Sequence, residues 1–290
     1  MAATPYSGAC PRPRSRPLVP GCGSCKERLL LLLLASGAVV ASPHRLAAQT
    51  DLPAPHLAAA ASPEMRRAER ALSDARARFQ AAAANAEAGW QSGRACFDWA
   101  EFATNDTQRA AIATEGIAAC RQAMARDPNL GAAHYYLAMN LGQLARTKSL
   151  GALKLVTRME AAFQTAIALD PGFDYAGPHR SLGLLYLQAP GWPTSIGSRK
   201  QARAHLRKAV ELAPSHPENR LCLLEAYLEW GDRKAVQPEL KPVEEVLRQA
   251  RARYTGEQWE GAWKDWDARW ARAQAKAAEP VSRLRSPRDG

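Results

Sequence analysis

The sequence contains few of the residues that build metal sites or covalent cross-links. Its 290 residues include six cysteines, and only Cys96, Cys120 and Cys222 lie beyond residue 49. An odd number allows at most one internal bridge. Cys96 and Cys120 either pair across adjacent antiparallel helices or, as we favour, are small buried residues. We expect no metal site, because no Cys-x2-Cys pair follows residue 49 and because four histidines show no zinc-ligand spacing: His134, His179, His205 and His216.

The motifs of common enzyme classes are also missing from the sequence. No Ser/His/Asp order, phosphate-binding glycine loop or close carboxylate pair lies in a context that supports catalysis. Glu225 and Glu229 are four residues apart on an expected helix, a spacing more typical of a solvated or salt-bridged face. We therefore predict a non-enzymatic protein with no catalytic residues and no cofactor.

Dense blocks of one charge are rare. Residues 1–49 hold six Lys/Arg and one Glu, so the rest of the chain has 33 basic and 27 acidic residues, a net charge of +6. Charged residues make up 23% of the sequence and are scattered along the expected helices, apart from a short basic tail at residues 279–290. This distribution argues against nucleic-acid binding. We expect the tail to be disordered and solvated.

No apolar run is long enough to span a membrane. The longest, Leu29 to Ala41, has 13 residues and follows a basic segment. Small residues then precede cleavage sites near Ala41 and Ala48, a pattern typical of a secretory signal peptide over residues 1–48. We expect an exported, periplasmic protein without a lipid anchor, because no cysteine lies directly after the apolar run.

The remaining chain has the organisation of one helical domain. Residues 49–62 contain prolines and an alanine run, which predicts a flexible linker. Apolar residues recur at helical spacing from Met65 to about Ala88, which predicts one long helix there. The helical domain is expected to extend over residues 63–278.

An internal repeat dominates this domain. Pro128, Pro171 and Pro214 are spaced 43 residues apart, and each lies five residues after an alanine. Two of these prolines are followed by another alanine- and leucine-rich helical pattern, so the repeating unit is a helical hairpin that ends at a proline. Stacked hairpins predict an all-α solenoid that forms a single domain.

The repeat resembles the tetratricopeptide family, whose unit of about 34 residues places small residues where paired helices approach closely. This chain's units are longer, and the excess lies near residues 145–151 and 189–197, at the same expected edge of the solenoid. Such insertions are often functional loops. The best copy of the family pattern consists of His179, Leu182, Gly183, Tyr186, Ala202, Leu206, Ala209 and Pro214.

A second resemblance covers roughly residues 90–240. The stretch from Asp174 to Gly183, the Gly-Trp-Pro loop at 191–193 and the segments at 217–221 and 225–228 are similar to the T-component of tripartite ATP-independent periplasmic (TRAP) transporters. That resemblance implies tetratricopeptide-like hairpins that dock a periplasmic solute-binding protein. The chain resembles the eukaryotic regulator-of-microtubule-dynamics family more weakly, through the same scaffold and a similarly placed loop.

These patterns predict a binding surface made of concave helices and inserted loops. Trp192, flanked by Pro190 and Pro193, is either presented to a partner or folded inward to fill the gap beside the insertion. We expect a protein partner or a small ligand, and a homo-oligomer is compatible with the sequence. The predicted binding residues are Tyr135, Met139, Gln143, Tyr175, His179, Arg180, Trp192, Ile196 and Glu225.

The last expected helix carries an aromatic stripe. Thr255 and Gln258 have capping-box spacing at its start. The stripe is favoured as a cap that buries itself on the preceding helix, and the alternative is a subunit interface. Its indoles follow at steps of four, three and four: Trp259, Trp263, Trp266 and Trp270.

Two functional classes fit these observations. The first is an exported adaptor that serves a transporter by binding its solute-binding protein. The second is a general envelope assembly scaffold that mediates protein–protein interactions and has no role in transport. Genes for transporter subunits beside this one would favour the first class.

Overall fold

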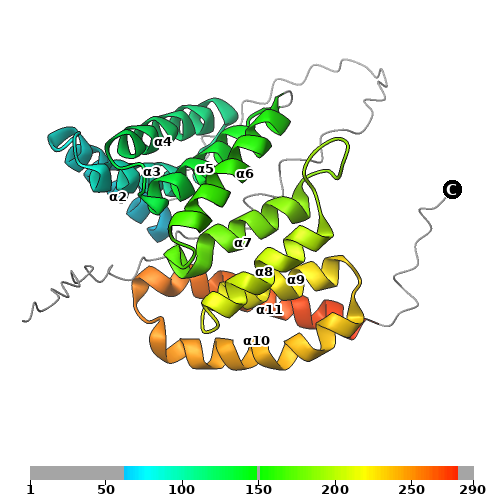
Figure 1. Ribbon diagram of the computed structural model, residues 1–290. Helices are drawn as coiled ribbons and strands as arrows, with labels where there is room; N and C mark the ends of the chain where they lie inside the picture. Colours follow the sequence, from blue (N-terminus) through cyan, green and yellow to red (C-terminus); the bar gives the residue numbers. More distant parts are fainter. Residues whose placement is uncertain (1–61, 149–150, 280–290) are drawn as a thin grey trace, which may run out of the picture.

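The computed structural model describes residues 62–148 and 151–279, which contain ten α-helices and no β-strand (Figure 1). A short 3-10 helix, Glu257–Trp259, precedes the last of them. The helices are α2 (Pro63–Ala81), α3 (Ala86–Ala100), α4 (Asp106–Arg126), α5 (Gly131–Ala145), α6 (Ala152–Leu169), α7 (Phe173–Gln188), α8 (Arg199–Leu212), α9 (Pro217–Glu229), α10 (Arg233–Arg253) and α11 (Glu260–Ala278).

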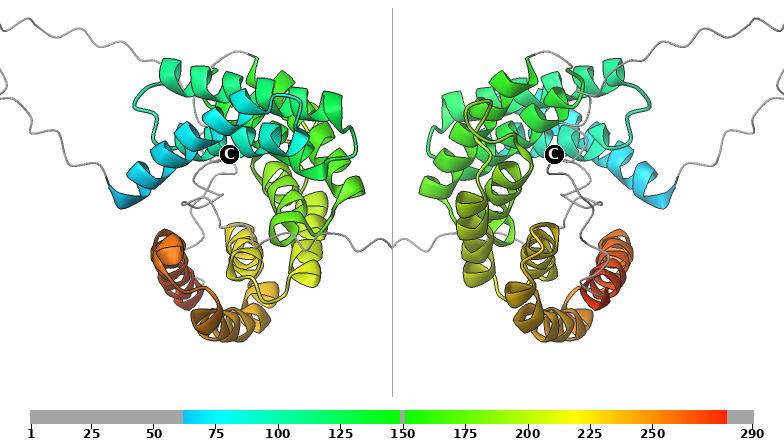
Figure 2. Two further views of the ribbon diagram at one scale, coloured as in Figure 1. Left: turned by 90° about the vertical axis from the view of Figure 1, so that its left-hand side faces the viewer. Right: turned by 90° about the vertical axis from the view of Figure 1, so that its right-hand side faces the viewer.

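The helices pair as antiparallel hairpins in chain order, which confirms the expected all-α solenoid. Helices α3 and α4, α5 and α6, α7 and α8, and α9 and α10 pack against each other, and each pair contacts the next. The stack curves into an open ring, with α7 and α9 on its inner side and α8 and α10 outside (Figure 2). One continuous core runs through most of the ring.

The repeated prolines mark the hairpin boundaries, as the spacing predicts. Helices α4, α6 and α8 each end two residues before Pro128, Pro171 and Pro214 respectively. A proline cannot continue a helix, because its ring clashes with the preceding turn and it has no amide hydrogen. The 43-residue repeat therefore corresponds to one hairpin and its connection.

Small residues lie where the paired helices approach most closely. A Cβ atom on Gly183 in α7 would lie 2.9 Å from Leu206 Cγ in α8. A Cβ on Gly93 in α3 would lie 2.2 Å from Cys120 Sγ in α4. Larger side chains at either glycine would force the two helices apart.

The three cysteines of the described residues are free thiols. Cys96, Cys120 and Cys222 are all buried. Burial raises the pKa of Cys96 to about 12 and shifts that of Cys120 further in the same direction. The structure therefore confirms the favoured interpretation: Cys96 and Cys120 are small buried residues with no bridge between them.

Two expectations about helix starts and ends are wrong. The first is the helix predicted from Met65 to about Ala88, which ends at Ala81. A turn intervenes there, and the Asn85 side chain accepts hydrogen bonds from Glu87 N and Ala88 N to begin α3. Apolar spacing alone did not reveal that cap.

The second is the capping box before the last helix, which does not form. Gln258 donates a hydrogen bond to the backbone carbonyl of Thr255 (3.0 Å), so neither side chain caps the helix in the expected way. The chain instead enters α11 through the 3-10 turn, whose preceding residue, Gly256, has a φ of 93°. That left-handed value favours glycine, which has no Cβ to clash.

The aromatic stripe of α11 covers the C-terminal end of the stack, but it does not pack only on the preceding helix. Trp259 and Trp266 are buried, and the Trp266 indole donates to Glu218 of α9 (2.9 Å). Trp263 is half-buried beside α10, where its indole donates to the Tyr254 carbonyl (2.7 Å). Helix α11 thus covers both α9 and α10.

The expected signal peptide, nearly all of the linker and nearly all of the basic tail lie outside the described residues. Within residues 62–148 and 151–279, no helix combines the length and the apolar character that crossing a bilayer requires.

Candidate partner-binding site on the concave face

A left-handed turn opens α7 on the inner side of the ring. Asp174, Tyr175 and Ala176 have φ values of 49°, 56° and 62°. Each such residue with a Cβ costs about 1–2 kcal/mol relative to right-handed geometry. Strained backbone of this kind persists only where surrounding contacts fix it, and it clusters at functional sites.

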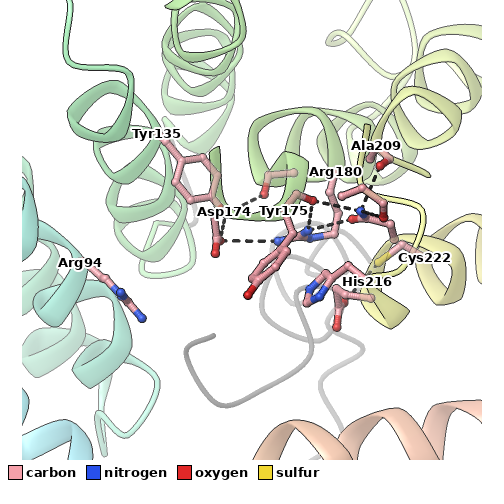
Figure 3. Close-up of polar contacts among 12 residues, drawn as sticks. Arg94, Tyr135, Asp174, Tyr175, Arg180, Ala209, His216 and Cys222 are labelled. Atoms are coloured by element: carbon pink, nitrogen blue, oxygen red, sulfur yellow. Dashed lines mark hydrogen bonds and ion pairs between the residues drawn. The ribbon is translucent and has the colours of Figure 1, made fainter. Parts of the chain in front are cut away.

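A buried amide and a buried guanidinium fix the turn. The Asn219 side chain, from α9, donates to the carbonyls of Tyr175 (3.0 Å), Ala209 (3.0 Å) and Ala213 (3.2 Å). Arg180 donates to Asn219 Oδ1 (2.8 Å) and to the Tyr175 carbonyl (3.3 Å). The carbonyl of the strained residue therefore accepts from two side chains (Figure 3).

The turn directs one aromatic ring across to the next hairpin. Tyr175 stacks on His216, with ring centroids 4.3 Å apart and planes 9° apart. Tyr254 lies edge-on to both rings, and its hydroxyl is 3.3 Å from His216 Nδ1. Burial lowers the pKa of His216 to about 3, so this imidazole is neutral at physiological pH. Tyr175 itself is half-exposed.

The turn also places a carboxylate on the inner side. Asp174 Oδ2 lies 3.6 Å from Arg180 and accepts a hydrogen bond from the Tyr135 hydroxyl (3.4 Å). Burial raises the pKa of Asp174, although Arg180 and Arg94 oppose that shift. Figure 3 shows Arg94 of α3 on the other side of the space that Asp174 faces.

A buried arginine connects α11 to α9. Arg269 is 1% exposed and pairs with Glu218 (2.7 Å), Glu225 (2.8 Å) and Asp265 (3.2 Å). Burial alone would raise the pKa of Glu218, but Arg269 and Arg180 lower it to about 2. Three carboxylates thus share one guanidinium, which leaves this wall of the ring with more acidic than basic groups.

These side chains give the concave face hydrogen-bonding and aromatic groups on a rigid frame. Partly exposed members come from three helices, of which α3 and α7 are separated by the α5–α6 hairpin: Arg94 and Asp98 from α3, Asp174 and Tyr175 from α7, and Glu218 and Glu225 from α9. Among the residues that the structure describes, no three His, Cys, Asp or Glu side chains are placed to hold a metal ion. The arrangement is suited to non-covalent recognition.

Several predicted binding residues lie in the packed interior and are not on the exposed surface. Tyr135, Met139 and Gln143 of α5 are buried. Gln143 donates to Glu101, which also accepts from Arg146 (3.2 Å), so the amide is part of an ion-paired contact between α3 and α5. In this structure their side chains contact other residues of the same chain. That they also contact a partner stays a prediction.

Two further predicted residues form separate contacts of α7. Arg180 fixes the left-handed turn, and His179 Nδ1 lies 3.0 Å from His205 Nδ1 of α8. Burial lowers the pKa of His179 to about 4, with a contribution from His205. Glu225 is paired with Arg269, in agreement with the salt-bridged face expected for it.

The inserted loop holds Trp192 in solvent. Its side chain is 89% exposed, so the inward-folded alternative is wrong. Ile196, from the same loop, is half-buried and packs against the core. Figure 1 places this loop beside the end of the α5–α6 hairpin, as expected for two insertions at one edge.

Sequence reasoning missed several members of this site. Asp174 and Asn219 lie within stretches that support the T-component resemblance, but no local pattern marks either as a site residue. Arg269 is not among the predicted binding residues either. Helical spacing does place Asp265 and Arg269 on one face, four residues apart, and that was the available signal.

Comparison with known proteins supports the fold and part of the sequence interpretation. Residues 57–185 match the family model of the regulator of microtubule dynamics protein 1-3, which covers less than half of the chain. The weaker of the resemblances, to the regulator-of-microtubule-dynamics family, is therefore the one that a family model matches, and the comparisons do not show the T-component resemblance. None of the curated proteins matches significantly.

Solved structures provide the comparison for the fold. A tetratricopeptide protein of Thermus thermophilus, TTC0263, is 20% identical, with a TM-score of 0.54 over 73% of this chain and 92% of that one. MamA is 18% identical, with a TM-score of 0.43 over 66% of this chain and 90% of that one. The chain has the tetratricopeptide-like fold, a solenoid of helical hairpins.

Proposed function

We propose that this protein is an interaction scaffold that binds a segment of a partner protein against its concave face. The observation that carries the proposal is the left-handed turn of Asp174, Tyr175 and Ala176. Its strain is balanced by Asn219 of the next hairpin and by Arg180 of α7 itself, and its result is a partly exposed aromatic ring and a carboxylate on the inner side of the ring. Strained backbone that surrounding contacts hold in place is typical of functional sites.

The chemistry of the face indicates what it binds. Half-exposed carboxylates and one aromatic ring line the α7 and α9 side, and Arg94 lies opposite. Such a mixture suits an extended peptide, whose backbone and polar side chains supply donors to the carboxylates and an acceptor to the arginine. The rigid helices keep the ordering cost of binding low on the scaffold's side.

The two functional classes that fit the sequence correspond to two versions of this role. In one, the chain is exported and its partner is a periplasmic solute-binding protein of a transporter. In the other, it is a general envelope scaffold with no transport role. Both need a partner on the same concave face, so they differ only in which protein is bound.

Cross-linking from the turn tests the proposal. A photo-reactive amino acid at Tyr175 in the full chain should capture a partner, whereas the same group at Leu212, on the outer helix α8 and 39% exposed, should not. The captured protein, identified by mass, distinguishes the two versions. Equal capture from both positions, or capture from Leu212 alone, would overturn the concave assignment.

A substitution combined with the same cross-linking experiment provides a second test of the proposal. Arg94→Gln removes the charge opposite the turn and leaves a shorter, neutral side chain that can still form hydrogen bonds. We expect the yield of the Tyr175 cross-link to fall at least tenfold with the melting temperature of the protein nearly unchanged. An unchanged yield would mean that the partner does not use this face.

A further inference from the structure

The edge formed by the two inserted loops has an unusual charge. No Asp or Glu occurs between Asp127 and Glu160, or between Asp174 and Glu211, whereas these stretches hold ten Lys and Arg residues. Four of the ten lie where the loops meet α6 and α8, are exposed, and form no ion pair within the described part of the chain: Lys148, Lys154, Arg199 and Lys200. We call these four, with Trp192 and Leu153, the basic edge.

The basic residues oppose local helix stability. Negative side chains in a first turn stabilise a helix through its dipole, and positive ones destabilise it. Helices α2, α3, α4 and α9 carry an acidic residue in their first turn. Helices α6 and α8, which begin at the basic edge, carry none there, and neither do α5 and α10. Helix α8 begins with Arg199 and Lys200, as α10 begins with Arg233 and Lys234. The helix dipole therefore does not account for the basic residues at the start of α8.

Acidic groups that border the edge are already paired. Glu101 accepts from Arg146, and Asp232 pairs with Arg203 (2.8 Å). Neither carboxylate is available to neutralise the four exposed basic side chains. The edge therefore presents a positive surface to solvent.

The loop that carries Trp192 is held in place. Gly197 N donates to the Pro190 carbonyl (2.8 Å), and Ser198 N donates to the Tyr186 carbonyl (2.9 Å). A Cβ on Gly197 would lie 2.1 Å from the Ala189 carbonyl oxygen, so only glycine permits this closure. With Ile196 anchored in the core, the loop presents its indole outward on a fixed base.

Two of the three exposed large hydrophobic side chains of the described residues belong to this edge: Trp192 at 89% and Leu153 at 38%. An indole that protrudes among lysines and arginines is typical of groups that lie at the headgroup level of a bilayer. We propose that the basic edge docks on a membrane surface rich in anionic lipid, with Trp192 inserted among the headgroups.

The exposure of the indole favours a lipid surface over an acidic protein. The loop lies at the end of the α7–α8 hairpin (Figure 1), and its Trp192 side chain is 89% exposed, so the indole is available to insert among headgroups. Docking at this edge leaves the concave face open, so the proposal is independent of the partner-binding function.

Vesicle sedimentation tests the proposal. The full chain should sediment with phosphatidylcholine vesicles that contain 30% phosphatidylglycerol and much less with phosphatidylcholine alone. Removing one basic side chain near such a surface weakens binding about fivefold, so Arg199→Gln with Lys200→Gln should weaken it about 25-fold. Trp192→Ala should also reduce sedimentation. The matched control, Lys241→Gln with Arg248→Gln on α10, should leave it unchanged.

A probe on the loop separates this edge from other lipid-binding segments of the full chain. Thr194→Cys, in a chain with Cys10, Cys22 and Cys25 replaced by serine, offers an exposed thiol, while the three remaining native thiols are buried. An environment-sensitive dye there should shift to the blue with anionic vesicles, and the same dye at Arg248→Cys should not.

Three outcomes would overturn the proposal. The first is sedimentation that does not differ between the wild type and the edge variants. The second is a dye shift that is equal on neutral vesicles. The third is binding of poly-glutamate, lost in the Arg199→Gln/Lys200→Gln variant, without any preference for anionic vesicles, which would assign the edge to an acidic protein.

Discussion

Charged side chains of the described residues are paired and largely buried on the concave face, whereas they are exposed and unpaired at the basic edge. On the concave face, Arg269 is buried and shared among three carboxylates, and Arg180 is fixed between Asp174 and Asn219. At the edge, the basic side chains are exposed and the indole of Trp192 lies in solvent. The first arrangement fixes the relative positions of α7, α9 and α11. The second adds little to the fold and leaves its groups available for binding.

The largest expected difference comes from removing the buried guanidinium. Arg269→Met should destabilise the protein by about 3–5 kcal/mol, because Glu218, Glu225 and Asp265, whose side chains are largely covered, would lose the guanidinium that they share. The free energy of unfolding from denaturant titration measures this. Arg248→Met, at an exposed pair with Glu245, is the control and should change it by less than about 1 kcal/mol. Similar effects in both variants would contradict the comparison.

Trp266, which packs beside the same buried ion pairs, provides a second test of the concave region. Trp266 is 1% exposed and donates to Glu218, so Trp266→Ala should cost about 3–5 kcal/mol. The melting temperature at unchanged oligomeric mass checks this result. Dissociation into smaller, equally stable particles would instead make the α11 stripe a subunit interface.

The amide that holds the left-handed turn should have an intermediate effect. Asn219→Ala removes the donor to three carbonyls, and each buried acceptor without a partner costs about 1 kcal/mol or more, so we expect a loss of about 2–4 kcal/mol. The Tyr175 cross-link should weaken as well, because the turn loses its support. A variant that loses stability but cross-links normally would separate the turn from recognition.

Acid should weaken the concave region before it affects the edge. The pKa of His216 is lowered to about 3 in the folded protein, and its ordinary value is 6.5. Its contribution is complete above pH 6.5 and is lost as the pH falls toward 3, because only the unfolded chain takes up the proton. This corresponds to about 2 kcal/mol between pH 7 and pH 5.

A histidine variant checks the pH dependence. His216→Phe should flatten the decline in unfolding free energy between pH 7 and pH 5, although His179, with a pKa of about 4, continues to contribute with the same sign. Asp174 has the opposite sign at lower pH, because its pKa is raised. An equally steep decline in the variant would show that His216 is not the group that titrates.

The smallest effect is expected at the edge. Trp192→Ala should change the free energy of unfolding by less than about 0.5 kcal/mol, because the side chain is 89% exposed. Differential scanning calorimetry of this variant beside Trp266→Ala makes the comparison direct. An early melting transition in the Trp192 variant would mean that the loop supports the fold.

The sequence by itself determined the architecture. Pro128, Pro171 and Pro214 each lie two residues after the end of a helix, and the 43-residue spacing predicted the hairpins and the shared edge of both insertions. These signals are local, because helix periodicity and helix termination act within a few residues. Where a short-range cap interrupts a continuous apolar pattern, as at Asn85, the same reasoning failed.

The binding surface was decided by tertiary structure. Tyr175 and Arg180 meet at the left-handed turn, but Tyr135, Met139 and Gln143 became buried because the inner helices pack more tightly than a simple concave face implies. Arg180 and Asn219 are 39 residues apart and Arg269 and Glu218 are 51 apart. No local pattern predicts such pairs. The left-handed backbone and the buried ion pairs arise only when distant hairpins fix one another.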